Sequence, residues 1–257
     1  MRTIKIRGMI LGEGREKIVS SIMDPKMEDL MKTLDLVKGS HLDCIEYRGD
    51  WSEDVHNHVK MQENLRRIRD YMGDFPILFT FRSVGEGGHL DIPVEEYVEL
   101  NRRLIDTGCL DMVDVESWIG DELVRGLCEY SHARDVKVVC SYHNFKETPS
   151  VEWMTELMRH MRDLGADIPK CAVMAKDRKD LLRLLTATEA ATDREEDGPV
   201  LTMAMGKEGM FSRLCGEMFG SCLTFSSLKA SSAPGQVPVE ETYELMERLH
   251  RNCTMGY

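Results

Sequence analysis

The stretch ADIPKCAVMA, residues 166–175, places one lysine, Lys170, inside an otherwise apolar run. Burial disfavours the charged form of an amine. A neutral lysine amine is a nucleophile toward carbonyl carbons, with which it forms a Schiff base. The alternative is a lysine whose stem packs on apolar surface while its ammonium group reaches solvent. The residues predicted to lie around Lys170 distinguish between these two interpretations.

His143, in VVCSYHNFKETP, is the one histidine of eight that falls at the end of a predicted strand. An imidazole at this position is suited to moving protons near neutral pH. His56 and His58 instead fall at the start of a polar helical segment with no third ligand nearby. The sequence therefore predicts an acid–base histidine and no metal site.

Charged or hydrogen-bonding side chains stand at most of the other predicted strand ends. They are Ser21, Glu46, Arg48, Arg82, Glu116 and Arg213. Glu46 and Arg48 are two residues apart, so they project from the same face of their strand. Polar groups are common where strands meet water, but a set of this size indicates a site with a positively lined mouth. Beside such a set, the nucleophilic interpretation of Lys170 is favoured.

Two stretches that contain glycine, SVGEGG after Arg82 and SSAPGQ after Arg213, could also contribute to the site. The glycines of SVGEGG would let Glu86 fold back over the site. SSAPGQ has Pro-Gly at the centre of a turn, which could present Ser232 and Gln236 as a lid. Either stretch could also be an ordinary connection.

The elements that must position these residues alternate between short apolar runs and helix-length segments of period 3.6. The runs span residues 17–22, 41–48, 76–83, 110–117, 136–143, 166–174, 199–205 and 220–226. Such repeated βα units predict a (β/α)₈ TIM barrel, whose catalytic groups lie at the C-terminal strand ends. An open doubly wound sheet is less favoured because no run is followed by GxGxxG or a P-loop. The strand-like TIKIRGMI, residues 3–10, predicts a short β-hairpin closing the lower end.

Composition indicates one soluble domain, residues 1–257. The chain has no apolar run long enough to span a membrane, and its N-terminus lacks the apolar core of a signal peptide, so a cytoplasmic location is expected. A net charge of −12 argues against general binding to nucleic acid or to an anionic membrane surface. The eight scattered cysteines are typical of small buried residues in a reducing compartment.

Eight motifs together resemble the type I 3-dehydroquinate dehydratases of the shikimate pathway. They occur in the family's order over nearly the whole chain: IEYRGDW, FTFRSVGEGG, VDVES, VVCSYHNFKETP, ADIPKCAVM, MGKEGMFSR, GSCLTFSS and SSAPGQ. The SYHNF…TP, DIPK and APGQ elements are the most specific of them.

The resemblance implies a TIM-barrel homodimer that dehydrates 3-dehydroquinate to 3-dehydroshikimate without metal or cofactor. Lys170 would form the imine with the substrate ketone, His143 would act as general base and acid, and Glu86 would orient His143. Arg213 would clamp the substrate carboxylate, a task suited to a guanidinium group. The residues implied to grip the remaining hydroxyls and the carboxylate are Ser21, Glu46, Arg48, Arg82, Ser232 and Gln236.

Two alternatives remain at this point. Another Schiff-base barrel, such as a class I aldolase, would also carry a lysine on a strand, but HNF…TP and APGQ argue against it. A non-catalytic barrel that binds a metabolite would be expected to have lost Lys170, His143 or Glu86, and all three are present.

Overall fold

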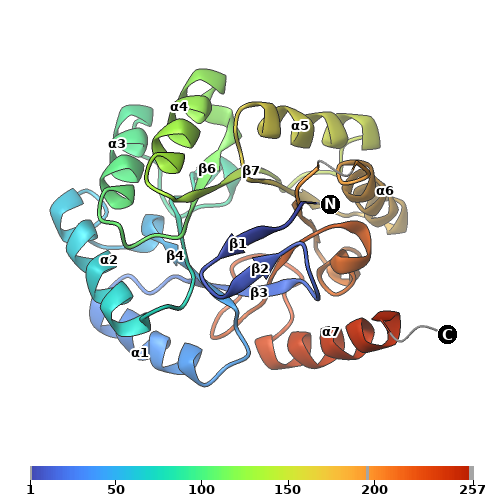
Figure 1. Ribbon diagram of the computed structural model, residues 1–257, viewed down its shortest axis with the longest axis horizontal. Coiled ribbons are helices and arrows are strands. Elements are labelled where there is room, and N and C mark those ends of the chain that lie inside the picture. The colour runs from blue at the N-terminus through green and yellow to red at the C-terminus, as the bar shows by residue number, and fades with distance from the viewer. Residues whose placement is uncertain (1, 195–196, 255–257) are drawn as a thin grey trace.

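The computed structural model describes residues 2–194 and 197–254. Its core is an eight-stranded parallel sheet in the order β10-β3-β4-β5-β6-β7-β8-β9 (Figure 1). The strands are β3 (Lys17–Ile22), β4 (Cys44–Arg48), β5 (Ile77–Thr80), β6 (Met112–Glu116), β7 (Lys137–Asn144), β8 (Ile168–Met174), β9 (Leu201–Met205) and β10 (Leu223–Phe225). A bridge between Val200 and Ser221 joins the ends of the sheet, with the Cys222 N–H donating to the Val200 carbonyl at 2.8 Å. The predicted TIM barrel is therefore confirmed.

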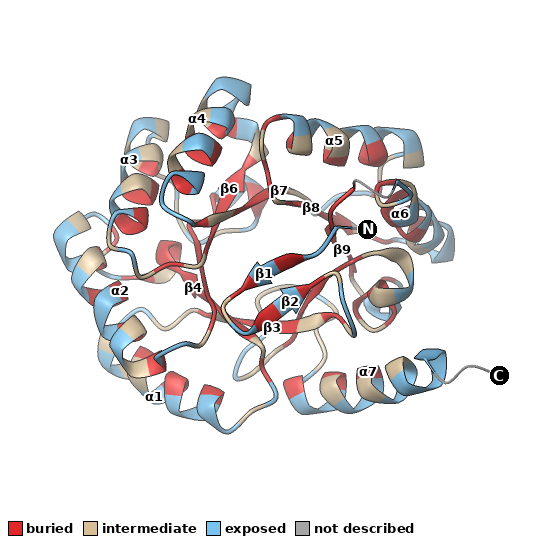
Figure 2. Cartoon of the chain, viewed as in Figure 1, coloured by how far each residue is buried: buried red, intermediate tan, exposed pale blue. Residues whose placement is uncertain are grey.

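Helices surround the strands and bury only their inward faces (Figure 2). They are α1 (Met27–Lys38), α2 (His58–Met72), α3 (Val94–Ile105), α4 (Asp121–His132), α5 (Val151–Asp163), α6 (Arg178–Ala190) and α7 (Val239–Thr254). In α5, Met154, Met158 and Met161 are buried at helical spacing. Between β9 and β10 the chain instead forms two one-turn 3₁₀ helices, η4 (Met210–Arg213) and η5 (Gly216–Phe219).

The predicted N-terminal hairpin is present and lies across one end of the barrel (Figure 1). Its antiparallel strands are β1 (Ile4–Ile6) and β2 (Met9–Leu11). Alternate residues point inward and join an apolar cluster with residues at or near the starts of the barrel strands, among them Val19, Cys44 and Leu78. The hairpin therefore seals the lower end, and the C-terminal strand ends form the mouth.

Several predicted strands are shorter in the structure. The run 220–226, for example, is a strand only over Leu223–Phe225. The flanking residues are mostly buried but belong to the connecting segments. A buried residue in a strand and one in a connection look alike in the sequence, so the ends of a strand cannot be predicted closely. Six of the eight cysteines are buried, as expected, whereas Cys109 is half-buried and Cys253 is exposed.

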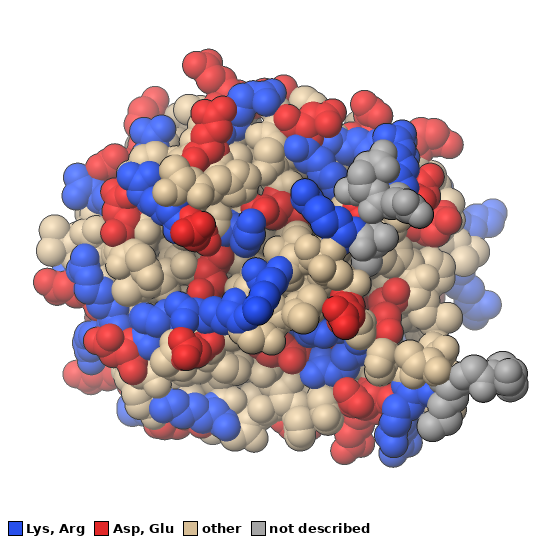
Figure 3. All heavy atoms as spheres, viewed as in Figure 1, with Lys and Arg blue, Asp and Glu red and all other residues tan. Residues whose placement is uncertain are grey.

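On the face that carries the hairpin, Lys and Arg are interspersed with Asp and Glu (Figure 3). Among the helices in the described part of the chain, none combines the length and the apolar character needed to cross a bilayer.

Tyr97 of α3 fixes the strand that carries Asp114 and Glu116. Its buried hydroxyl accepts from the Glu116 N–H at 3.0 Å and donates to the Asp114 carbonyl at 3.3 Å. The ring packs edge-on against Phe81, with the centroids 5.9 Å apart. This contact links the outer helix to the residues that organise the barrel mouth.

We expect Tyr97→Phe to lower the free energy of unfolding by about 1–3 kcal/mol, because it leaves a buried N–H without a partner. Urea denaturation with an unchanged m-value would measure this loss. Tyr130→Phe is the matched control, since the Tyr130 hydroxyl bonds to Asp106 near the surface and its loss should change stability by less than about 0.5 kcal/mol. Equal effects of the two substitutions would contradict the role given to Tyr97.

Candidate active site

A closed pocket of about 40 Å³ lies at the mouth of the barrel. It is lined by Ser21, Glu46, Arg48, Arg82, Glu86, Gly87, His143, Phe145, Lys170, Ala172, Met203, Met205, Phe225, Ser232, Ala233 and Gln236. Nine of the ten site residues predicted from the sequence are in this lining. The tenth, Arg213, is not.

Lys170 lies in the interior of β8, and its side chain is 4% exposed. Its Nζ atom is 3.2 Å from Asp114 Oδ2 and lies over the Phe225 ring, 4.7 Å from the centroid. A carboxylate and the face of an aromatic ring both attract a positive charge. The prediction considered burial alone and missed Asp114, the carboxylate that lies beside the Lys170 amine.

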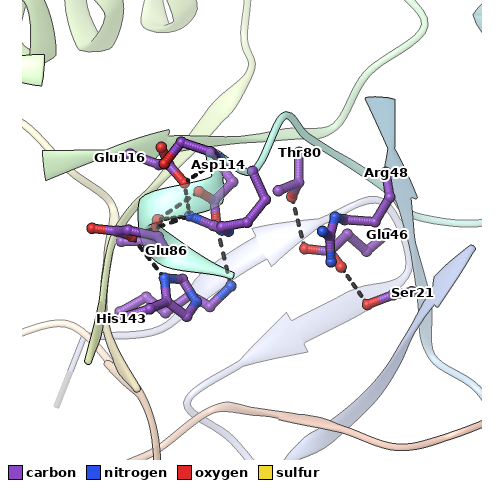
Figure 4. A network of polar contacts seen from close by, with 12 residues as sticks. Ser21, Glu46, Arg48, Thr80, Glu86, Asp114, Glu116 and His143 are labelled. Carbon is purple, nitrogen blue, oxygen red and sulfur yellow. Dashed lines mark hydrogen bonds and ion pairs between the residues drawn. The ribbon is translucent and has the colours of Figure 1, made fainter. Parts of the chain in front are cut away.

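Arg82 follows β5 and pairs with the acidic groups around Lys170, of which Asp114 and Glu116 are labelled in Figure 4. Its guanidinium lies 2.7 Å from Asp114 Oδ2 and 2.8 Å from Glu116 Oε1, and it also donates to Ser141 Oγ at 2.8 Å. Burial would raise the pKa of Asp114, but Arg82 and Lys170 outweigh it and lower that pKa below its ordinary value. Two buried cations therefore face two carboxylates that also accept hydrogen bonds.

His143 lies near the end of β7, where its Nδ1 atom is 2.8 Å from Glu86 Oε2. Glu86 reaches it from the one-turn helix η2 (Val84–Glu86), as expected for a segment that folds back over the site. Gly88 makes this turn possible, because a Cβ atom there would overlap the Arg82 carbonyl.

Burial controls the protonation of this pair. It raises the pKa of Glu86 to about 8, against the opposing effect of Arg82. It also lowers the pKa of His143 well below its ordinary value, an effect that nearby Arg82 and Lys170 increase. At neutral pH these shifts favour a protonated Glu86 and an uncharged imidazole.

A second set of polar side chains forms the opposite wall of the pocket (Figure 4). Glu46 accepts from the Ser21 hydroxyl and from Thr80 Oγ1, the latter at 2.7 Å. Arg48 projects beside Glu46 and is held by Asp50 through two hydrogen bonds of 2.8 and 2.7 Å. These contacts fix the orientation of the Glu46 and Arg48 side chains in the wall.

The SSAPGQ segment covers the pocket and is tied to this wall. Ser232 Oγ lies 3.1 Å from Ser21 Oγ, to which it can donate, and it accepts from Gln236 Nε2 at 2.8 Å. Gly235 has φ +82°, a conformation that glycine adopts readily, as the predicted turn requires. Ser232 and Gln236 therefore both face the site.

Arg213 lies behind the lining, at the end of η4. It donates to the carbonyls of Phe225 and Pro234 at 3.4 and 3.2 Å, and its Nε atom has no hydrogen-bond partner among the described residues. The residue is 2% exposed, and burial lowers its pKa to about 10. No carboxylate of the described chain lies within ion-pair distance of it. Arg213 is therefore a buried guanidinium that touches the pocket walls but lacks an anion.

Four buried residues that organise the site were not predicted: Asp50, Thr80, Asp114 and Ser141. Asp114 had a signal in the sequence, because it stands two residues before Glu116 in VDVES and must share its face of the strand. Ser141 pairs with Lys170 across β7 and β8, a register that only the closed barrel reveals.

The fold and the site define a (β/α)₈ barrel with a buried lysine and a carboxylate-bound histidine in one pocket. A family model described as type I 3-dehydroquinase matches residues 18–252. The chain belongs to the type I 3-dehydroquinase family, a family of lyases, as the resemblance predicted.

Similar proteins agree with this assignment. A 3-dehydroquinate dehydratase of Clostridioides difficile is 41% identical over 251 residues, covering 98% of both chains, and one of Salmonella agona is 40% identical over 98% of this chain and 100% of its own. The crystal structure of the type I enzyme from Clostridium difficile with covalently modified comenic acid superposes with a TM-score of 0.94, at 41% identity and over 98% of this chain and 99% of its own. That of the Geobacillus kaustophilus dehydratase gives 0.93, at 32% identity and 97% of each chain.

We expect His143 to bind its second proton only well below pH 6.5 in the unliganded protein, because charging it would place a third buried cation beside Arg82 and Lys170. Nitrogen-15 NMR of the imidazole would follow this titration, with His143→Gln identifying the signal. The urea-unfolded protein is the control, in which histidines titrate near ~6.5. A His143 titration at or above that value in the folded protein would contradict the predicted effect of burial.

Proposed function

We propose that this protein dehydrates 3-dehydroquinate to 3-dehydroshikimate through a Schiff base on Lys170, with His143 as the acid–base group. The observation that carries the proposal is the convergence of the buried Lys170 amine and the His143–Glu86 pair on one closed pocket. The family assignment supports it, as does the covalently modified comenic acid of the similar Clostridium difficile structure.

In the first step, Lys170 attacks the substrate ketone as the neutral amine, after any ammonium proton has passed to solvent. The ketone oxygen leaves as water with one hydrogen from the amine and one proton from Glu86, relayed by His143, and the lysine nitrogen becomes the nitrogen of an iminium ion. Asp114 and the Phe225 ring, which neighbour the lysine nitrogen, then face this positive charge. The surroundings that hold the amine thus also suit the cationic intermediate.

In the second step, His143 removes a proton from the carbon next to the iminium group, and the electron pair moves toward the nitrogen. For this task Nε2 must carry the lone pair. Nδ1 then carries the imidazole proton and donates it to Glu86, which is ionised because it gave up its own proton in the first step. The resulting imidazolium can return its proton to the departing hydroxyl, which leaves as water. Hydrolysis of the product imine restores Lys170.

The remaining predicted residues bind the substrate in this proposal. Ser21, Glu46, Arg48, Ser232 and Gln236 line the wall and the lid, where they can bind hydroxyl and carboxylate groups. Arg82 also lines the pocket, although its donors already serve acidic partners.

In this proposal the SSAPGQ segment, which lines the pocket through Ser232 and Gln236, opens to admit the substrate. That movement would also release Arg213 from the Pro234 carbonyl and let it meet the substrate carboxylate. A homodimer in the cytoplasm, working without metal or cofactor, completes the proposal as the resemblance implies.

We expect incubation with 3-dehydroquinate and sodium borohydride to leave one reduced adduct per chain on Lys170, located by intact-mass and peptide mass spectrometry. Lys170→Ala should form no adduct. His143→Ala should still form it while losing about 10² to 10⁴ in turnover. Dehydration without any adduct would contradict the Schiff base, and unchanged turnover in His143→Ala would contradict its acid–base role.

We expect Arg213→Ala chiefly to raise the Michaelis constant for 3-dehydroquinate, because it removes the cation assigned to the substrate carboxylate. Steady-state kinetics would separate KM from kcat. Arg159→Ala is a control, since Arg159 lies on α5 and donates to the Ala190 carbonyl outside the mouth. A loss confined to kcat in Arg213→Ala would show that Arg213 is not the carboxylate clamp.

A further inference from the structure

A tryptophan just outside the mouth is hydrogen-bonded to one of the buried acids of the site. Trp118 lies in the one-turn helix η3 (Ser117–Ile119), which follows β6 directly, so it stands two residues beyond Glu116. Its indole Nε1–H donates to Glu116 Oε2 at 2.5 Å. Trp118 is 52% exposed, whereas Glu116 is fully buried. The indole therefore reaches a buried carboxylate from the surface of the protein.

A second pocket, of about 550 Å³, brings Trp118 close to the acid–base pair. Its lining includes Trp118 and Tyr142 together with Glu86 and His143. Glu86 and His143 also line the active-site pocket, and Trp118 does not. The tryptophan thus lies on the outer side of the pair, outside the space in which the substrate is proposed to react.

Glu116 is held by donors at both of its oxygens. Oε1 accepts from Arg82 Nη1 at 2.8 Å and from the Ser83 N–H at 3.1 Å. For Oε2, the Trp118 indole is the one donor in the described part of the chain. A buried carboxylate is stable as an anion only when it is paired and hydrogen-bonded, so Trp118 completes the set of donors that Glu116 needs.

The guanidinium of Arg82 is shared between Glu116 and Glu86. Its Nη1 atom lies 2.8 Å from Glu116 Oε1 and 3.5 Å from Glu86 Oε2. Its Nη2 atom faces Asp114 Oδ2 at 2.7 Å. One positive charge therefore serves three carboxylates, and a change in the other donors to one of them alters how well it stabilises the rest.

Other titratable or charged groups also lie around Glu86: Arg82, Asp91, Asp114, His143 and Lys170. Burial raises the pKa of Glu86 most, and Arg82 opposes it. The negative charges of Glu116 and Asp114 raise this pKa further, Glu116 more than Asp114, whereas Lys170 lowers it. Asp91, in the outer pocket, accepts from the Val84 N–H at 2.8 Å. Among these neighbours, Glu116 is the carboxylate whose charge matters most to Glu86.

We propose that Trp118 is a positioning residue for the acid–base pair. Its indole N–H stabilises the charge of Glu116, so that more of the positive charge of Arg82 remains available to an ionised Glu86. In the mechanism above, Glu86 gives up its proton as the imine forms. Without the indole N–H, Glu86 would release that proton less readily, and the reaction would slow. This inference rests on the proposed function, since it concerns the proton that Glu86 supplies.

The first test is a titration of Glu86 in the unliganded protein by carbon-13 NMR of the glutamate carboxyls, with Glu86→Gln identifying the signal. Trp118→Phe keeps an aromatic ring beside Glu116 but removes the donor. The pKa of Glu86 should rise above its parent value of about 8, because the charge on Glu116 is then less well compensated. We expect a rise of about one, which is a tenfold change in the protonation equilibrium.

Trp153→Phe is the matched control. Trp153 lies on α5, is 44% exposed and packs against the Tyr142 ring with the centroids 5.1 Å apart, so it is another surface tryptophan close to the outer pocket. It makes no contact with Glu116, and its replacement should leave the Glu86 titration at the parent value.

Steady-state kinetics with 3-dehydroquinate give the second readout. Trp118→Phe should lower kcat about tenfold, in line with the change in the Glu86 equilibrium, and leave KM unchanged because Trp118 does not line the active-site pocket. Replacing Trp118 alone by 3-benzothienylalanine, which has sulfur in place of the N–H, keeps the shape of the ring. It should reproduce both effects, and it also serves if Trp118→Phe does not fold.

A Glu86 pKa that stays unchanged or falls in these proteins would overturn the role of Trp118, even if kcat fell, because a loss of packing would then be sufficient. A raised pKa with unchanged kcat, or with a change confined to KM, would also overturn it. Failure of the proposed function is seen separately, as the absence of dehydration and of a borohydride-reduced adduct in the parent protein. The titration needs no substrate and still tests the link from Trp118 to Glu86 in that case.

Discussion

The arrangement of the mouth depends on the ion pairs of Arg82 with Asp114 and Glu116. All three residues are buried, and a charge removed from water is stable only when it is paired and hydrogen-bonded. Arg82 and Lys170 supply two positive charges, and the two carboxylates of β6 supply two negative ones. This balance lets an amine lie inside a barrel core. Burial, together with the negative charges of Glu116 and Asp114, also raises the pKa of Glu86, the third acid near Arg82, to about 8.

The same surroundings limit what His143 can do. Burial, and then the nearby Arg82 and Lys170, make a protonated imidazole unfavourable, and Glu86 keeps its proton at neutral pH. In the proposed mechanism, the charge on the lysine nitrogen would change between attack and formation of the iminium ion. The protonation of the His143–Glu86 pair would then change with it, so that a base becomes available when one is needed.

Site residues could be predicted from the sequence where a residue type is unusual for its local pattern. They were harder to predict where their neighbours are brought together only by closure of the barrel. Lys170 in an apolar run, His143 at a strand end and the glycines around Glu86 could be recognised without a structure. Asp114 could have been found from its spacing to Glu116. Ser141 could not, because its place beside Lys170 follows from the register of β7 and β8. The position of Arg213 behind the lining also depends on how η4 packs, which no local pattern determines.

The surroundings of Lys170 and those of Arg213 differ in whether each buried charge has a partner of opposite charge. This difference distinguishes the part of the site proposed to carry out the reaction from the part proposed to bind the substrate. Around Lys170, every buried charge has a partner, so the geometry is fixed before substrate arrives, as preorganised catalysis requires. Around Arg213, a buried guanidinium has two carbonyl oxygens and the Met203 sulfur as its partners in the described part of the chain. A ligand carboxylate would form stronger, charge-assisted hydrogen bonds than these. The incomplete part of the site therefore gains most from an anionic ligand, and in the proposed function the opening of the SSAPGQ segment is the step through which binding can be coupled to closure.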